Sequence, residues 1–308
     1  MTAGKEFPAE QTRRRVLLAL GAAPLTALAA GAGAGAAATP TRSSVTPASQ
    51  GAAGTLPRYV RLHWAARGAW VMWVYGGVLL VKPEGQVARP LVRIRGISFS
   101  RALPREDGGY DCELDEAGYY CDLASGEPLE TLRNPFTDRD LRVVHYRSPQ
   151  KLRLAGTAFT PAQALPPGIE YRGELTTLAE VGGLVAMTED LYVRLPATPA
   201  QDGRPARPER FSASLATFTA KAAELADPRA DWVASTLSYG TMNSFAAWLG
   251  MDGVAGVQNM RLAGDKRRST DLAAVAPDLL ARVRRDHPTF LQVPSASAPT
   301  IRPRSDRP

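Results

Sequence analysis

The residues best suited to acid–base chemistry lie between positions 119 and 146, in the segment YYCDLASGEPLETLRNPFTDRDLRVVHY. In the strand expected at the end of this segment, side-chain alternation puts His145 on the more apolar face. One interpretation is a core histidine whose ring nitrogens are satisfied by the backbone or by a carboxylate. The other is a general acid or base that projects into a barrel interior and is oriented by Asp122 or Glu127, which flank the preceding turn.

No motif of a known reaction accompanies these residues. The sequence has no Gly-x-Ser-x-Gly, no His-Glu-x-x-His, no phosphate-binding glycine loop and no dinucleotide fingerprint. Its three histidines, His63, His145 and His287, lie in unrelated contexts, and its two cysteines are not spaced like zinc ligands. We therefore expect no metal site. The sequence identifies no cofactor and leaves open whether the protein is an enzyme.

Aromatic side chains are the best candidates for contacts with a ligand. Trp73, Tyr75, Tyr120 and Trp248 lie in or near segments expected to form strands or a helical turn. In a β-barrel such rings either fill the core or line a cavity, where Trp and Tyr add a polar group. We include Asn134 in the predicted ligand-binding set, although an Asn-Pro pair is also typical of the start of a turn.

The elements that must position these residues are short strands separated by turns, from residue 58 to about 195. The segment WVMWVY, from Trp70 to Tyr75, is apolar on both faces. Such a strand is covered on both sides or lines a pocket on one of them. The series predicts a mainly β fold, an antiparallel barrel-like or sandwich domain with a short C-terminal helix. The proline-rich stretch 196–210 is expected to be a long loop inside this domain.

The part of the chain after this loop is expected to mix strands and helical turns. Residues 211–225 predict a strand that gives way to a helical turn. A second helical turn is expected to end at Gly250, with Asn243 or Ser244 as its cap.

The segment APDLLARVRRDHP is the best helix in the sequence. Pro277 stands in its first turn, where a missing amide hydrogen costs nothing, and Pro288 follows its end. The apolar residues of this helix are expected to face the protein, whereas Arg282 and Arg285 are expected to face water.

The two cysteines allow two arrangements. If residues 115–118 form a turn, Cys112 lies opposite Cys121 and the two can form a disulfide. If the turns instead fall at 108–109 and 125–126, both cysteines lie on one long strand and point to opposite faces. The sequence alone leaves both arrangements open.

The N-terminal segment has the layout of an export signal. Thr12-Arg13-Arg14-Arg15 and the two apolar residues that follow match the twin-arginine pattern, and small residues near position 38 offer cleavage sites. We therefore expect a twin-arginine signal peptide over residues 1–38. The twin-arginine export machinery is then a partner, and the location is periplasmic or secreted. No cysteine lies near the cleavage region, so no stable membrane anchor is expected.

The rest of the chain divides by composition. Residues 39–57 are rich in Thr, Ser, Ala, Pro and Gly, which is typical of a flexible linker. Residues 58–294 are expected to form a single β-rich domain, and residues 295–308 a disordered tail. The chain has 37 Lys and Arg against 30 Asp and Glu, a net charge of +7. Because the arginines are scattered among acidic residues, we expect no binding of nucleic acid.

Several of these segments together resemble a bacterial family of exported proteins defined by domain of unknown function 1838. The resemblance covers about residues 58 to 294, and includes WVYGG, AAWLGM and a late GDK. Its most specific part is an ordered set of turn and strand residues: Tyr120, Asp122, Gly126, Glu127, Asn134, Pro135 and His145. The resemblance implies export and one β-rich domain, and it implies no reaction.

Three functional hypotheses follow from the sequence. The first is an exported β-barrel that binds a small, largely apolar molecule in its cavity. The second is a small-molecule enzyme, an isomerase, lyase or hydrolase, that uses His145 with Asp122 or Glu127. The third is a surface interaction protein, which predicts an exposed apolar patch and no cavity.

Overall fold

The computed structural model describes residues 52–200, 206–227 and 229–292. The expected signal peptide over 1–38 and the expected tail over 295–308 lie outside the described residues. Most of the expected linker over 39–57 also lies outside them, but its last six residues belong to a helix that begins at Ala52. Among the described helices, none combines the length and the apolar composition needed to cross a membrane.

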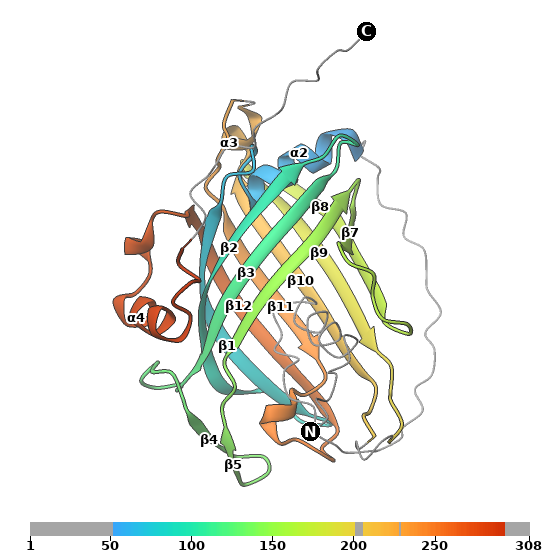
Figure 1. Cartoon of the computed structure of the whole chain (residues 1–308), viewed down its shortest axis with the longest axis vertical. Helices are drawn as coiled ribbons and strands as arrows, with labels where there is room; N and C mark the ends of the chain where they lie inside the picture. The colour runs from blue at the N-terminus through green and yellow to red at the C-terminus, as the bar shows by residue number, and fades with distance from the viewer. Residues whose placement is uncertain (1–51, 201–205, 228, 293–308) are drawn as a thin grey trace, which may run out of the picture.

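Ten antiparallel strands form a closed barrel (Figure 1). Around the barrel they follow the order β1-β12-β11-β10-β9-β8-β7-β6-β3-β2. Their bounds are β1 (Val71–Pro83), β2 (Arg89–Pro104), β3 (Tyr110–Cys121), β6 (Tyr146–Ala155), β7 (Ala158–Pro161), β8 (Glu170–Val181), β9 (Leu184–Leu195), β10 (Arg210–Lys221), β11 (Thr236–Asn243) and β12 (Gly256–Arg268). The predicted mainly β, antiparallel fold is confirmed, and it is a barrel rather than a sandwich.

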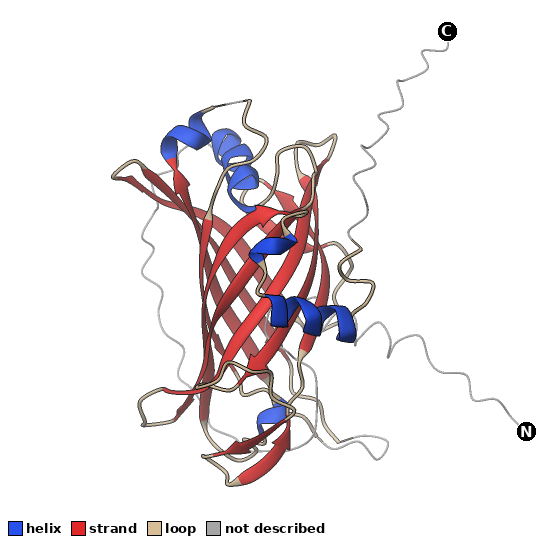
Figure 2. Cartoon of the chain, turned by 90° about the vertical axis from the view of Figure 1, so that its left-hand side faces the viewer, coloured by secondary structure: helices blue, strands red, loops and turns tan. Residues whose placement is uncertain are grey.

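The remaining elements cover the ends and one side of the barrel. Helices α2 and α3 lie at one end, and the β4–β5 hairpin and the short helix η1 lie at the other (Figure 1). Helix α4 lies against the outer wall (Figure 2). The bounds are α2 (Ala52–His63), β4 (Thr131–Asn134), β5 (Arg139–Arg142), α3 (Ala222–Ala226), η1 (Ala247–Leu249), η2 (Leu272–Ala274) and α4 (Pro277–Asp286).

Strand β1 is apolar on both faces because both faces are covered. Met72 on the outer face belongs to the core cluster beneath α4. Trp73 and Tyr75 on the inner face line the barrel interior. The expectation for this strand is confirmed, since it is covered outside and borders a cavity inside.

Glycines on the neighbouring strands make room for two interior tyrosines. A Cβ atom on Gly96 would lie 2.2 Å from the hydroxyl oxygen of Tyr75, and one on Gly118 would lie 2.1 Å from the Cζ atom of Tyr146. Each tyrosine ring therefore packs directly against the backbone of a glycine, where a larger residue would clash. Their hydroxyl groups are 3.0 Å apart and share a hydrogen bond.

The two cysteines lie on one long strand, β3, so the second of the two sequence-based arrangements is confirmed. Both thiols are free and buried. Cys112 lines the interior of the barrel, whereas Cys121 packs in the cluster beneath α4. The wall of the barrel separates them.

The expected change from strand to helical turn after residue 211 is confirmed by β10 and α3. Helix α4 also begins at Pro277, as expected. The cap expected for the turn before Gly250 is wrong. Ala246 precedes η1 without a side-chain cap, because Asn243 belongs to β11 and accepts a hydrogen bond from Ser212.

One arginine of α4 does not face water as expected. The side chain of Arg282 is only 16% exposed, and it forms ion pairs with Glu130 and Asp286. Its guanidinium group also lies over the ring of Tyr119 on the barrel wall. The long aliphatic stem lets this arginine cover apolar surface while its charge is paired.

The C-terminal end of α2 is held inside the barrel by a buried lysine. The Nζ atom of Lys266 donates hydrogen bonds to the carbonyl oxygens of Arg61, Leu62 and Trp64, at 2.6, 2.8 and 3.1 Å. Burial lowers the pKa of Lys266 to about 7. The three carbonyl acceptors at the negative end of a helix favour the protonated amine, which alone has three N–H donors. This contact fixes the last turn of α2, including His63.

Replacing Lys266 by methionine keeps the aliphatic stem and removes the donors. We expect the Lys266→Met variant to lose about 2 kcal/mol of unfolding free energy, because buried carbonyl groups then lack partners. Urea denaturation measures this loss. The matched variant Lys82→Met, at an exposed position of β1, should change the unfolding free energy by less than about 0.5 kcal/mol. Equal effects of the two substitutions would contradict the capping role.

Candidate functional site

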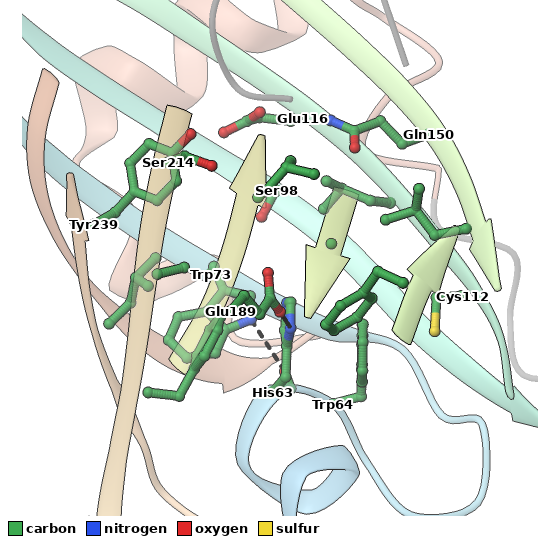
Figure 3. A pocket seen from close by; sticks show the side chains of 18 of the residues that line it. His63, Trp64, Trp73, Ser98, Cys112, Glu116, Gln150, Glu189, Ser214 and Tyr239 are labelled. Atoms are coloured by element: carbon green, nitrogen blue, oxygen red, sulfur yellow. Dashed lines mark hydrogen bonds and ion pairs between the residues drawn. The ribbon is translucent and has the colours of Figure 1, made fainter. Parts of the chain in front are cut away.

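The barrel encloses a cavity at the end covered by α2. Its volume is about 140 Å³, comparable with a cavity of about 150 Å³ that holds benzene. Aromatic side chains form much of its wall (Figure 3). These side chains are His63, Trp64, Trp73, Tyr75, Phe159, Tyr171, Phe218 and Tyr239.

Two glutamates interrupt otherwise apolar inner faces of the strands. On β9, alternation places Glu189 on the same face as Met187 and Leu191. On β3 it places Glu116 on the same face as Cys112 and Leu114. Burial desolvates both carboxyl groups, which disfavours their charged forms.

His63, the last residue of α2, forms a hydrogen-bonded pair with Glu189. The distance from its Nδ1 atom to the Oε1 atom of Glu189 is 2.8 Å, and the hydroxyl of Tyr59 lies 2.9 Å from the same nitrogen. The imidazole ring stacks between Trp64 at 4.0 Å and Phe218 at 4.3 Å between ring centroids. This packing fixes the orientation of the ring.

Burial favours the uncharged forms of both partners in this pair. It lowers the pKa of His63 well below its usual value, with a smaller contribution from the charge of Lys266. It also raises the pKa of Glu189 to about 8. At neutral pH the pair is therefore a neutral imidazole and a carboxylic acid that share one proton. The raised pKa brings Glu189 near neutral pH, the range in which a carboxyl group can act as a general acid or base.

Glu116 is the second carboxyl group of the cavity and has a free oxygen. Its side chain is 5% exposed, and its Oε2 atom has no hydrogen-bond partner among the described residues. Burial raises the pKa of Glu116 to about 7, opposed by a hydrogen bond from Tyr75. Gln150 belongs to the neighbouring strand β6, and Figure 3 shows the side chains of Glu116 and Gln150 on the side of the cavity away from His63.

The residues predicted to bind a ligand are divided between two regions. Trp73 and Tyr75 line the cavity. Tyr120 and Trp248 pack against each other at the opposite end of the barrel, with ring centroids 4.8 Å apart. Asn134 is fully buried at that end, where its amide donates to the carbonyl of Leu249 at 2.6 Å. Tyr120, Trp248 and Asn134 therefore pack at that end and do not line the cavity.

The residues predicted to be catalytic are not brought together. His145 lies between β5 and β6, where its Nδ1 atom accepts a hydrogen bond from the backbone of Tyr120, and its ring packs against Tyr119. Asp122 accepts hydrogen bonds from the backbone of the following turn, and Glu127 is exposed. In the described part of the chain, no hydrogen bond or ion pair joins either carboxylate to His145, which does not line the cavity.

Sequence reasoning did not single out Glu189 and Glu116 as cavity residues. A signal for both was present, because each is a lone acid on an otherwise apolar face of a strand. His63 carried no such signal, since its place in the cavity depends on the docking of α2. Among the residues that the structure describes, no cluster of three or more His, Cys, Asp and Glu side chains is placed to hold a metal ion.

Comparison with known proteins gives a family. The model of the family described as "Protein of unknown function (DUF1838)" matches residues 66–301, so the chain belongs to this family. The match begins three residues after His63, and it contains both glutamates of the cavity. No curated protein matches the chain.

The raised pKa of Glu189 predicts a pH-dependent contribution to stability. Between pH 4.5 and 8 the folded state binds more protons at this residue than the unfolded state, so its contribution falls as the pH rises. We expect wild type to lose at least about 1 kcal/mol relative to Glu189→Gln between pH 5 and pH 8. Urea denaturation at each pH measures the difference. A relative stability of wild type that stays level or rises over this pH range would contradict the raised pKa of Glu189.

Proposed function

We propose that this family member binds a small, largely apolar molecule in the cavity of its barrel. The observation that supports the proposal is a cavity of about 140 Å³ with an aromatic wall and only a few polar groups. This combination is typical of sites for small molecules, where apolar surface supplies affinity and polar groups fix orientation. A cavity of this size suits a molecule built around a single ring.

The cavity distinguishes this proposal from a surface interaction protein. That alternative predicted an exposed apolar patch and no cavity. Large exposed apolar side chains among the described residues include Val87 between β1 and β2, the cross-strand partners Val181 and Leu184 at the β8–β9 turn, and Leu215 and Met242 on the outer wall. A few exposed apolar side chains, single or in pairs, are normal on a protein surface.

An acid–base enzyme in the same cavity is the second candidate function. The observation that favours it is the contact of 2.8 Å between His63 and Glu189, both of which line the cavity. A bound molecule with an exchangeable proton would lie beside a group able to accept or donate it. His63 is therefore a better candidate for this role than His145, because His63 has both a carboxyl partner and access to the cavity.

We also propose that the protein is exported through the twin-arginine route and works in the periplasm or outside the cell. The support is the pattern around Arg13 and Arg14. Two free, buried cysteines on opposite faces of one strand are compatible with an oxidising compartment, because they cannot pair with each other.

Filling the cavity should abolish binding of a small neutral aromatic molecule. We expect benzyl alcohol to bind wild type with a Kd of about 1 mM or tighter. It should bind Ala216→Phe at least about tenfold more weakly, because the added ring occupies the cavity. Ala216 is buried on the inner face of β10. Isothermal titration calorimetry measures both affinities.

The matched control is Ala213→Phe, since Ala213 lies on the opposite face of the same strand. This variant should bind benzyl alcohol like wild type. The absence of saturable binding to wild type would contradict the proposed function, and so would equal affinities of the two variants.

Export predicts a defined change of location. Replacing Arg13 and Arg14 together by lysine should leave the protein in the cytoplasm, because the export machinery recognises the arginine pair. Cell fractionation and immunoblotting measure the location. The neighbouring substitution Arg15→Lys, outside the pair, should leave export unchanged. Normal export of the double variant would contradict the assigned route.

A further inference from the structure

Carboxyl groups line the cavity of a chain that is basic overall. The lining includes Glu113, Glu116, Glu189 and Asp190 and no lysine or arginine. Strand alternation points Glu116 and Glu189 inward, and Glu113 and Asp190 toward the outer face. The whole chain has 37 Lys and Arg against 30 Asp and Glu. The inward-facing acidic groups of the cavity wall are therefore Glu116 and Glu189, and the lysine at the α2 end, Lys266, is bound to the carbonyl groups of α2.

Some of these acidic groups have partners in the protein. Glu113 forms ion pairs with Arg101 at 2.6 Å and with Lys151 at 3.3 Å. Glu189 shares a hydrogen bond with His63. Glu116 differs from both, because no ion pair involves it in the described part of the chain and its Oε2 atom is unpartnered. Glu116 is only 5% exposed and lines the cavity. Its Oε2 atom is therefore a buried acceptor without a donor among the described residues.

The surroundings of Glu116 are suited to a positive charge. The rings of Tyr75 and Tyr239 line the same cavity as Glu116, and neither side chain carries a positive charge. An ammonium ion gains from a carboxylate by charge-assisted hydrogen bonds and from aromatic faces by cation–π attraction. Burial of an unpaired carboxylate is unfavourable, and a ligand that brings its own cation removes this penalty.

We propose that the ligand is a small organic ammonium ion, with Glu116 as its counter-ion and the aromatic wall around its apolar body. This inference rests on the proposed function, because it requires a ligand in the cavity. It narrows the ligand from a largely apolar molecule to an amine that is protonated at neutral pH. The ring or short alkyl body of the amine extends toward Trp73 and Phe218.

Two probes of the same shape test this inference. Benzylamine carries a cation at pH 8, whereas benzyl alcohol is neutral. We expect wild type to bind benzylamine at least about tenfold more tightly than benzyl alcohol by isothermal titration calorimetry. The Glu116→Gln variant should lose this preference and bind benzyl alcohol with an unchanged affinity. Glu174→Gln, which removes an exposed carboxylate on β8, should keep the preference.

A second measurement uses wild type alone, in case Glu116→Gln does not fold. Near pH 7 the pairing of an ammonium ion with a protonated carboxyl group releases a proton. Titrations in two buffers of different ionisation enthalpy should therefore show proton release for benzylamine and none for benzyl alcohol. The tyrosines around Glu116 are Tyr75, Tyr120, Tyr146 and Tyr239, whose pKa values burial raises, so they do not release protons in this range. Glu189 lines the same cavity and titrates near this range, so the proton release should persist in Glu189→Gln.

The outcomes separate the two proposals. Equal affinity for the two probes, without proton release, would overturn the ammonium inference and leave the cavity as a site for neutral molecules. A preference for benzylamine that survives Glu116→Gln would assign the charge to another group and overturn the role of Glu116. If neither probe binds wild type, the proposed function itself is wrong.

Discussion

The closed ring of strands decides which side chains meet inside this protein. In a closed barrel every second residue of each strand points inward, so ten strands fix the composition of one common interior. A barrel of this width is too wide to be filled by its own side chains everywhere, and separate elements cover its two ends. The β4–β5 hairpin and η1 pack at one end, and α2 packs at the other. The cavity is the space that remains next to α2.

The positions and protonation states of the polar groups inside the barrel depend on one another, because these groups are buried together. Lys266 binds the last carbonyl groups of α2, and this contact holds His63 against Glu189. Desolvation favours neutral His63 and protonated Glu189, so their contact does not require two buried charges. Glu116 has no such partner for its free oxygen. The Oε2 atom of Glu116 is thus a buried acceptor at the cavity that a ligand or solvent can satisfy.

Much of the fold could be predicted from local patterns, because strands and helices place apolar residues at characteristic intervals in the sequence. The two apolar faces of Trp70 to Tyr75 and the proline at the start of α4 are examples. The site was harder to predict, because it depends on contacts between distant parts of the chain. Helix α2 begins in a segment with the composition of a linker, and it is held by Lys266, more than two hundred residues later. His145 was expected on an apolar face, but its ring lies beside Tyr119, close enough to Arg282 and Asp286 of α4 for their charges to act on it.

The most direct test of this account is a crystal structure of the purified, full-length folded chain that resolves the inside of the barrel. We predict an open space bounded by Trp73, Glu116 and Glu189, with ordered solvent or a copurified molecule in contact with the Oε2 atom of Glu116. A collapsed interior, in which the aromatic side chains fill this space and Glu116 is bonded to the protein through both oxygens, would contradict it.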